Sequence, residues 1–241
     1  MVAGVPFDVG GYVLAGGKSS RMGRDKALLE LAGKPLALRA VTKLRRVCAD
    51  VHILSARPEL GVFAPLVRDL QEGCGPLGGL EAALAHSRHE WSLFMPVDMP
   101  FLPAAFLELW VRAVLARGPM GMRVGMFTVD GLPQPLFSVL HKEVAPFVQE
   151  AMRCGRYKVF PVLESAAKDL AVRQGMLLGD VFFNTPWGSK ADSFVGAVED
   201  EDELRRRLTE AQLEATDLWF ENLNTAEEFA EAEQHLMALD T

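Results

Sequence analysis

Residues 11–31 read GYVLAGGKSSRMGRDKALLEL, an apolar segment followed by a glycine-rich basic loop. The uniformly apolar residues 12–15 predict a strand that is buried on both faces. Gly16 and Gly17 end this strand, and glycine lets a backbone approach a ligand so closely that its N–H groups can hold phosphate oxygens. Four cations follow, namely Lys18, Arg21, Arg24 and Lys26. Because cations neutralise polyphosphates, the stretch predicts a phosphate-binding loop at the end of a buried strand.

The loop does not match the P-loop, whose pattern is G-x-x-x-x-G-K-[ST]. Gly17, Lys18 and Ser19 supply the end of that pattern, but Tyr12 stands where its first glycine is required. The alternative to a phosphate site is a solvated basic turn between two structured segments. The phosphate hypothesis therefore depends on what the rest of the chain places beside this loop.

The composition is that of an ordinary folded protein, with 49% hydrophobic and 24% charged residues in a chain of 241. This length suits one α/β domain over residues 1–241 with a substantial core. The net charge of −7 and the sequence pI near 5.3 disfavour binding to nucleic acid or to an anionic membrane. A local basic loop in an acidic protein instead indicates a small anionic ligand.

The three cysteines, Cys48, Cys74 and Cys154, show no C-x-x-C spacing. This pattern predicts a reduced protein without structural zinc. The N-terminal residues lack a charged region followed by an apolar one, so no signal peptide is expected. No apolar run is long enough to cross a bilayer, and a cytoplasmic location is expected.

A second glycine-rich stretch covers residues 70–79, LQEGCGPLGG. Its residues 73–78, GCGPLG, formally match the G-x-G-x-x-G fingerprint of dinucleotide-binding folds, and Asp98 stands about where that fingerprint places an acid. Two features oppose this interpretation: the strand before the loop is short, and Pro76 lacks an N–H that a phosphate cradle would use. We therefore interpret these glycines as a tight turn between a strand at 65–69 and a helix.

Residues 91–98, WSLFMPVD, form a nearly continuous apolar run that ends in a carboxylate. Such a run is typical of a central parallel strand, and ligands of open α/β sheets bind outside the carboxyl ends of the strands. Gly16 and Asp98 are both expected at such ends, so the chemistry is expected to converge there. Asp98 is the best candidate for a Mg²⁺ ligand, since Mg²⁺ in nucleotide sites takes one or two carboxylates plus phosphate oxygens. The alternative role for Asp98 is the N-cap of a helix that starts near Pro103.

The remaining segments predict an α/β protein with a three-layer α/β/α architecture and a mostly parallel, Rossmann-like sheet. Helices are expected at 103–117 and 143–154. The pair Asp130-Gly131 marks a hairpin between strands at 122–129 and 134–140. This hairpin is expected to supply one antiparallel strand.

Residues 35–47 are expected to form an amphipathic helix. Pro35 suits the first helical position because its missing N–H is not needed there. Apolar Leu38, Val41 and Leu44 fall at helical spacing, and Lys43, Arg45 and Arg46 fall mostly off that face.

Several motifs together resemble those of the molybdenum cofactor guanylyltransferase family, nucleotidyltransferases that make the dinucleotide form of the cofactor. The first is L-A-G-G-x-x-x-R-M-G-x-D-K at residues 14–26. The others are V-x-D at 67–69 with G-P-L-G-G-L at 75–80, V-D-M-P-F-L at 97–102, and F-E-N-L-N-T-A-E-E at 220–228. The resemblance covers about residues 10–164 and 218–235, and it implies the nucleotidyltransferase fold.

The resemblance implies transfer of GMP from GTP to molybdopterin-bound molybdenum cofactor, with release of pyrophosphate and dependence on Mg²⁺. As a protein partner it implies a molybdoenzyme or a chaperone. Implied nucleotide-binding residues are Leu14, Ala15, Gly16, Gly17, Arg21, Lys26, Asp69, Gly78 and Asp98. Among these, Arg21, Lys26 and Asp98 are the implied catalytic residues, Asp98 is the implied metal ligand, and Asp69 helps to hold the guanosine.

On the pterin side the resemblance implicates Gln134, Arg156 and Lys158, and it makes Asn222 and Asn224 amide ligands for substrate or for metal-bound phosphate. Without it, the two basic residues indicate only an ordinary solvated helix start. Asn222 and Asn224 alternate with larger residues and are expected to share one face of a short strand. Thr225 is expected to cap the final helix, with Glu228 at the capping-box position.

Residues 165–217 depart from the family pattern, because the family runs quickly from this point into its last motif. This insert contains an apolar and aromatic run at 181–188 and an acidic, helix-prone run at 199–214. A lid over the substrate, a partner surface and a dimer arm are all compatible with it.

Three other functions stay open. Cytidylyltransferases of the same cofactor carry Ala where this chain has Gly16, and the missing methyl group makes room for a purine, so GTP is favoured over CTP. Sugar-phosphate nucleotidyltransferases usually continue R-L-x-P where this chain has R-M-G at 21–23. The third alternative is a nucleotide- or cofactor-binding chaperone without turnover, with the insert as its partner surface.

Overall fold

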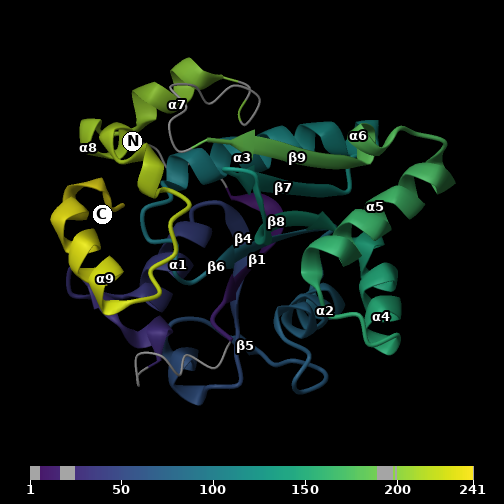
Figure 1. The fold of residues 1–241 in the computed structure, drawn as a ribbon, viewed down its shortest axis with the longest axis horizontal. Helices are drawn as coiled ribbons and strands as arrows, with labels where there is room; N and C mark the ends of the chain where they lie inside the picture. The colour runs from purple at the N-terminus through teal and green to yellow at the C-terminus, as the bar shows by residue number, and fades with distance from the viewer. Residues whose placement is uncertain (1–5, 17–24, 189–197, 199, 241) are drawn as a thin grey trace.

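The computed structural model describes residues 6–16, 25–188, 198 and 200–240. Its central element is a seven-stranded sheet with the order β5-β4-β1-β6-β8-β7-β9 (Figure 1). The strands are β1 (Phe7–Leu14), β4 (Cys48–Leu54), β5 (Leu66–Val67), β6 (Trp91–Pro96), β7 (Val124–Val129), β8 (Leu132–His141) and β9 (Phe182–Trp187). A separate two-stranded sheet pairs β2 (Glu30–Leu31) with β3 (Lys34–Pro35).

Within the described sheet, β8 alone runs against its neighbours. The strands β5, β4, β1 and β6 are mutually parallel, β8 is antiparallel to both β6 and β7, and β9 is parallel to β7. In the turn between β7 and β8, Asp130 and Gly131 have φ angles of 47° and 80°. This is the left-handed backbone that a two-residue hairpin loop requires. The predicted hairpin, with one antiparallel strand in a mostly parallel sheet, is therefore confirmed.

Helices cover both faces of the sheet and complete the three predicted layers. On one side lie α2 (Pro76–His86), α4 (Ala145–Arg153) and α5 (Val159–Gln174), and on the other lie α1 (Leu36–Leu44) and α3 (Ala104–Arg117) (Figure 1). The described core divides in the same way. Leu77, Phe94 and Leu163 belong to the cluster under α2, α4 and α5, and Val13 and Trp110 belong to the cluster on the opposite face.

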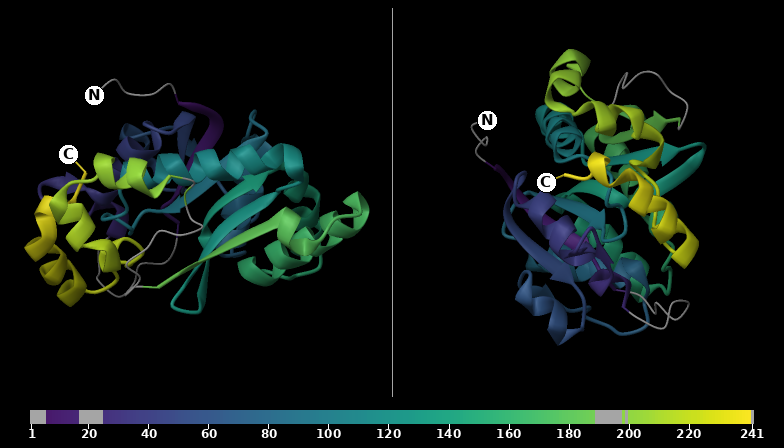
Figure 2. Two further views of the ribbon diagram at one scale, coloured as in Figure 1. Left: turned by 90° about the horizontal axis from the view of Figure 1, so that it is seen from above. Right: turned by 90° about the vertical axis from the view of Figure 1, so that its left-hand side faces the viewer.

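Short helices make up the rest of the described structure. They are α6 (Leu178–Val181), α7 (Glu201–Arg207), α8 (Glu210–Glu214) and α9 (Ala226–Ala232), with 3₁₀ turns η1 (Lys26–Leu28), η2 (Pro58–Val62), η3 (Gly118–Met120), η4 (Lys142–Val144), η5 (Thr216–Leu218) and η6 (Glu233–Ala238). Helices α7, α8 and α9 lie together at one end of the molecule (Figures 1 and 2).

Helix α1 differs from its predicted form in length and in burial. It begins at Leu36, because Pro35 is extended and pairs in β3. Lys43, which the helical pattern places off the apolar face, is nevertheless only 3% exposed. Its ammonium donates a hydrogen bond to the carbonyl of Pro100. Helical periodicity cannot predict a partner that is so distant in sequence.

The second glycine-rich loop turns the chain sharply into α2. Gly73 and Gly75 have φ angles of 79° and 62°, and Pro76 is the first residue of the helix. The strand before the loop, β5, pairs with β4, whereas the strand after α2, β6, pairs with β1. Strands β5 and β6 are therefore not the adjacent pair of a dinucleotide-binding βαβ unit, and the tight-turn interpretation is confirmed.

Part of the 165–217 insert belongs to the sheet and the core. Its strand β9 lies beside β7, and the Trp187 ring packs against Phe106, Trp219 and Phe220 at centroid distances of 5.1–5.5 Å. Further insert residues buried in the same cluster are Val198, Leu204 and Ala215. These segments therefore contribute to the folded core, a role that none of the three sequence-based alternatives included.

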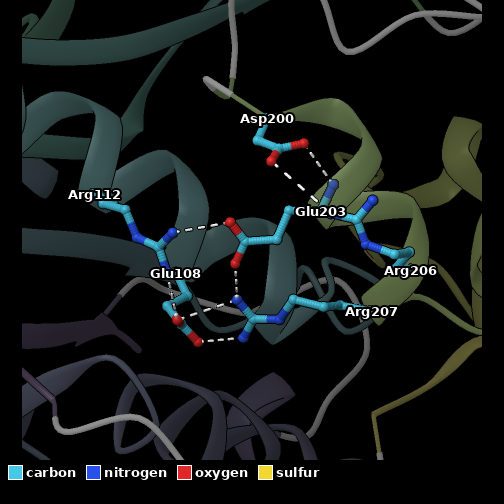
Figure 3. Close-up of polar contacts among 6 residues, drawn as sticks. All are labelled: Glu108, Arg112, Asp200, Glu203, Arg206 and Arg207. Atoms are coloured by element: carbon cyan, nitrogen blue, oxygen red, sulfur yellow. Dashed lines mark hydrogen bonds and ion pairs between the residues drawn. The ribbon is translucent and has the colours of Figure 1, made fainter.

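An ion-pair network joins the insert helix α7 to α3 (Figure 3). Arg207 donates to Glu108 from Nη1 at 3.1 Å and from Nη2 at 2.5 Å, and to Glu203 at 3.3 Å. Arg112 bonds the same two carboxylates at 3.3 Å and 3.0 Å. The bond to Glu108 raises the pKa of Arg207, and its side chain is 31% exposed, so solvent screens this network only in part.

Replacing Arg207 with Met is expected to lower the free energy of unfolding by about 1 kcal/mol, which is the upper range for surface ion pairs. The reason is that Arg207 binds Glu108 in a bidentate manner and that Arg112 bonds the same carboxylate. Urea denaturation measures this change. The matched control is Arg206→Met on the same helix. Arg206 is 68% exposed and lies 3.9 Å from Asp200, so the control should stay within about 0.5 kcal/mol of the wild type. Equal effects of the two substitutions would show that the network does not secure the insert.

All three cysteines are unpaired, with Cys48 and Cys74 buried and Cys154 exposed. Burial raises the pKa of the Cys48 thiol above its usual range, which keeps that thiol protonated. Within the described ranges, none of the helices has both the length and the apolarity that a membrane span requires.

Candidate active site

The site predicted from the first glycine-rich loop lies where the strand order of the sheet reverses. From β1 the chain adds β4 and β5 on one side, and β6 then pairs on the other side of β1. Ligands of open α/β sheets bind at this point, outside the carboxyl ends of the strands. A cavity of about 360 Å³ opens there. Its lining includes Leu14, Ala15, Gly16, Asp25, Lys26, Leu54, Asp69, Gly75, Pro76, Gly79, Asp98 and Leu136.

Lys26 connects three distant parts of the sequence at this cavity. It begins the turn η1, whose N-cap Asp25 accepts the N–H of Ala27 at 3.0 Å. The Lys26 ammonium donates to Asp98 Oδ2 at 2.5 Å and to Asn224 Oδ1 at 2.8 Å. The side chains of Lys26 and Asp98 are 13% and 18% exposed, so solvent screens their attraction only weakly.

Asn224 is held in place by the cap of the helix that follows it. Thr225 Oγ1 accepts the N–H of Glu228 at 3.1 Å, and Glu228 accepts the N–H of Thr225 at 2.9 Å. The Glu228 carboxylate also accepts the N–H of Asn224. The predicted capping box is therefore confirmed, and it fixes the backbone that carries Asn224.

Residues 221–224 join no sheet, so the short strand predicted there is wrong. Instead, the N–H of Leu223 donates to the carbonyl of Asp98 at 3.1 Å, which attaches the segment to the end of β6. Asn224 turns to Lys26, whereas Asn222 lines a second cavity. The two amides therefore do not act from one face.

Asp98 has the chemistry that Mg²⁺ requires. Its Oδ2 is bound by Lys26, and its Oδ1 is buried without a hydrogen-bond partner among the described residues. A buried carboxylate oxygen is costly unless a ligand covers it, and Mg²⁺ in nucleotide sites takes such oxygens together with those of phosphates. Asp98 does not cap α3, whose N-cap residue is Pro103. In the part of the chain that the structure describes, no preformed group of three or more His, Cys, Asp or Glu side chains could hold a metal ion by itself.

Asp69 lies against the first turn of α2. A Cβ added to Gly78 would be 3.3 Å from Asp69 Oδ2, and one added to Gly79 would be 3.7 Å from Oδ1. Glycine at these two positions therefore lets the carboxylate rest close to the start of the helix. Burial raises the pKa of Asp69. Gly78 itself does not line the cavity, so its effect on the site passes through Asp69.

Gly16 borders the cavity without being required by the backbone. A Cβ added to it would lie 3.6 Å from the carbonyl oxygen of Leu54, which is an ordinary contact. The fold would therefore accept alanine at this position. The space that the missing methyl group leaves belongs to the cavity.

Several predicted site residues are not brought to this cavity, namely Gln134, Asn222, Arg156 and Lys158. On β8 it is Leu136, two residues beyond Gln134, that lines the wall. Arg156 and Lys158 are exposed at the junction of α4 and α5, and Arg156 lines a separate small cavity. Gly17 and Arg21 lie outside the described residues. The roles of all six residues stay predictions.

The pair Asp25–Arg57 was not predicted from the sequence. Arg57, in the loop after β4, bonds the Asp25 carboxylate, whose side chain is 9% exposed. This bond ties the start of η1, and with it Lys26, to the neighbouring strand connection. No local signal could have found it, because the two residues are distant in sequence and each belongs to an ordinary turn.

A second cavity of about 380 Å³ lies beside the 221–224 segment. Five carboxylates line it, from Asp130, Asp217, Glu221, Glu228 and Glu231. Burial and then these neighbouring carboxylates raise the pKa of Glu221. Because this much negative charge repels phosphates, an anionic substrate is expected in the first cavity rather than the second.

Similarity to known proteins is concentrated in the first two thirds of the chain. The profile of the MobA-like NTP transferase domain matches residues 11–169. A molybdenum cofactor guanylyltransferase of Serratia proteamaculans is 33% identical over 168 residues, which cover 66% of this chain and 81% of that protein. Another, of Vibrio cholerae, is 32% identical over 159 residues, which cover 64% of this chain and 76% of that protein. The profile ends near the start of the 165–217 insert.

Solved structures extend the likeness in fold to most of the chain. The molybdopterin-guanine dinucleotide biosynthesis protein A of Archaeoglobus fulgidus superposes with a TM-score of 0.65 at 22% identity, covering 94% of this chain and 97% of that one. The 2-C-methyl-D-erythritol 4-phosphate cytidylyltransferase of Thermus thermophilus superposes with a TM-score of 0.55 at 15% identity, covering 96% and 99%. At these identities the comparison concerns the fold alone.

Proposed function

Because the chain belongs to the MobA-like NTP transferase family and is a nucleotidyltransferase, we propose that it transfers GMP from GTP to molybdopterin-bound molybdenum cofactor. Pyrophosphate is the second product. The names of the relatives, molybdenum cofactor guanylyltransferase, support this choice of substrates. One observation carries the proposal to this chain: Gly16, Lys26 and Asp98 meet in one cavity at the carboxyl ends of β1 and β6.

The acceptor would react through a terminal phosphate monoester on the pterin. The second pKa of such a monoester is about 6, so the group is largely ionised at pH 7 and needs no general base. One of its oxygens forms a bond to the α-phosphorus of GTP, and the bond from that phosphorus to the bridging oxygen of pyrophosphate breaks. Catalysis would then consist of positioning and charge neutralisation.

Residues of the first cavity supply these two effects. The N–H of Gly16 would hold phosphate oxygens, together with Gly17 and Arg21 from the same loop. Lys26 would neutralise the triphosphate and the departing pyrophosphate, since its ammonium already stands at the cavity in bonds to Asp98 and Asn224. Asp69 would accept N–H groups of guanine from its place at the start of α2.

Asp98 would hold Mg²⁺ through its buried Oδ1, which has no partner among the described residues. Bound there, the ion would supply positive charge beside the triphosphate. On the pterin side the predicted contacts are Gln134, Arg156 and Lys158, and Asn222 and Asn224 are the predicted amide ligands of substrate or of metal-bound phosphate. Of these, Asn224 has a bond to a cavity residue, Lys26.

Measuring pyrophosphate release with Mg²⁺, molybdenum cofactor and each of GTP, CTP, ATP and UTP tests this function. Release is expected with GTP, and only when the pterin is present. The space beside Gly16, which the fold itself does not require, is the physical reason to expect a purine. A matched reaction without cofactor is the control for simple hydrolysis of the nucleotide.

The other outcomes identify the alternatives. Release with CTP in place of GTP would keep the fold and the mechanism and would overturn the base assignment. Release with a sugar phosphate in place of the pterin would indicate a sugar-phosphate nucleotidyltransferase. Binding of GTP by folded protein with no release under any condition would indicate a binding protein without turnover.

A further inference from the structure

Two buried cations lie on the face of α1 that is turned towards the site segments. Arg39 and Lys43 are one helical turn apart, and they are 8% and 3% exposed. Arg39 donates to the carbonyl oxygen of Leu31 from Nε at 3.0 Å and from Nη2 at 2.6 Å. The Lys43 ammonium donates to the carbonyl oxygen of Pro100. Both cations therefore donate hydrogen bonds to backbone carbonyls in other segments.

The two carbonyls belong to the two segments that form the Lys26–Asp98 pair. Leu31 ends β2, which directly follows the turn η1 that begins with Lys26. Pro100 lies two residues after Asp98, in the loop between β6 and α3. One turn of one helix thus contacts both halves of the site, and neither cation is among the residues that line the cavity.

Asp240 also holds the loop between β6 and α3, at its end. Its Oδ2 accepts the N–H of Ala104, the first residue of α3, at 2.8 Å, and its Oδ1 accepts Gln212 Nε2 at 3.0 Å. The loop that carries Asp98 is therefore held at Pro100 by Lys43 and at Ala104 by Asp240. Asp240 also connects this loop to α8 of the insert through Gln212.

Burying these cations does not favour stability by itself. Burial lowers the pKa of Lys43 to about 8, with Asp240 opposing the shift and Arg39 and Arg46 adding to it. Burial likewise lowers the pKa of Arg39, again against the charge of Asp240. Well-packed apolar side chains often stabilise such positions better than buried charges do. Side chains that do not add to the stability of the fold are found most often at functional sites.

We propose that Arg39 and Lys43 are positioning residues, a clamp on α1 that fixes the Lys26 segment and the Asp98 loop relative to each other. Neither side chain touches the cavity, and each acts through one backbone carbonyl. The expected kinetic effects rest on the function proposed above, with Asp98 on the metal and Lys26 on the triphosphate. The expected structural effects do not depend on that function.

Two substitutions separate the halves of the clamp. Lys43→Met and Arg39→Met each keep a long side chain and remove the donor. Val41→Ala, at a fully buried position of the same helix, is the control for loss of stability without loss of a carbonyl bond. Lys43→Arg is the conservative variant, because it keeps a cation with N–H groups for the Pro100 carbonyl.

Amide hydrogen exchange measures the two segments in the absence of any substrate. Lys43→Met is expected to speed exchange at Ala104 and Leu223, whose N–H groups bond at or beside the Asp98 loop, by about 10-fold or more. Arg39→Met is expected to speed exchange at Leu29 and Leu36, which bond within and beside the Lys26 segment, by a similar factor. Each variant should leave the other segment as it is in the wild type.

Steady-state kinetics should separate the same two variants. Lys43→Met is expected to raise the Mg²⁺ concentration for half-maximal rate about 10-fold and to lower kcat, because displacement of a catalytic group by about 1 Å costs rate steeply. Arg39→Met is expected to raise the KM for GTP about 5- to 10-fold, with the Mg²⁺ requirement unchanged. Lys43→Arg should bring the Mg²⁺ requirement back towards that of the wild type. Val41→Ala should lower Tm and should change neither the Mg²⁺ requirement nor the KM for GTP.

The proposal is overturned if exchange in both segments is unchanged in the two Met variants and their activity falls only as far as their Tm predicts from Val41→Ala. If wild-type protein turns over no nucleotide but exchange responds as expected, the proposed function fails and the clamp is supported. The two variants report on different segments. If one of them does not fold, the other still tests the half of the clamp that it removes.

Discussion

Asp98→Asn should lower kcat for pyrophosphate release by roughly 100- to 1,000-fold, the usual loss when one preorganised electrostatic group is removed from an active site. The amide keeps the shape of the carboxylate and can still accept a hydrogen bond from Lys26. It removes the negative charge of the buried Oδ1, the atom that would bind Mg²⁺. The measurement is kcat at saturating GTP over a titration of Mg²⁺, with circular dichroism to verify folding.

Asp217→Asn is the matched control for this substitution. Asp217 lines the second, acidic cavity and does not line the first one, which contains Asp98 and Lys26, so the Asp217→Asn variant should have the Mg²⁺ requirement of the wild type. A strong effect at Asp217 with a weak effect at Asp98 would move the metal to the second cavity. Wild-type turnover by Asp98→Asn would make the metal assignment wrong.

Lys26→Met should reduce kcat/KM for GTP by about 10- to 100-fold, the effect of losing a charge-assisted hydrogen bond of about 1.5–3 kcal/mol. The loss should fall on GTP affinity and on the departure of pyrophosphate. The Mg²⁺ requirement should not rise, because the ammonium occupies Asp98 Oδ2 and its removal frees that oxygen. Initial rates over a matrix of GTP and Mg²⁺ concentrations measure both effects.

The control for this substitution is Lys34→Met, which changes an exposed lysine at the start of β3. This variant should have the same kcat/KM for GTP and the same Mg²⁺ requirement as the wild type. A rise in the Mg²⁺ requirement of Lys26→Met, without a change in the KM for GTP, would contradict the assigned role of Lys26.

Local patterns were sufficient for the parts of this protein that depend on neighbours in sequence. The apolar runs before Gly16 and before Asp98 became the two central strands β1 and β6, and the pair Asp130-Gly131 became the hairpin turn. The cap formed by Thr225 and Glu228 was predicted for the same reason. In each case a few consecutive residues determine the conformation.

Contacts between distant residues account for the features that the sequence did not reveal. Lys43 is buried because the Pro100 carbonyl receives its ammonium, and residues 221–224 lie on Asp98 instead of forming a strand. Strand β9 pairs with β7 although it lies beyond the residues 11–169 that match the family, and its Trp187 packs against Trp219, which is distant in sequence. Spacing within one segment contains none of this information.

The two outer strands of the seven-stranded sheet are poor templates for another chain. An outer strand that is long and regular offers a row of free N–H and C=O groups, which favours strand-by-strand aggregation. Here β5 is only two residues long, and β9 contains Pro186, which has no N–H to donate. On one side, this resistance to aggregation is therefore supplied by β9, which lies beyond the residues 11–169 that match the family.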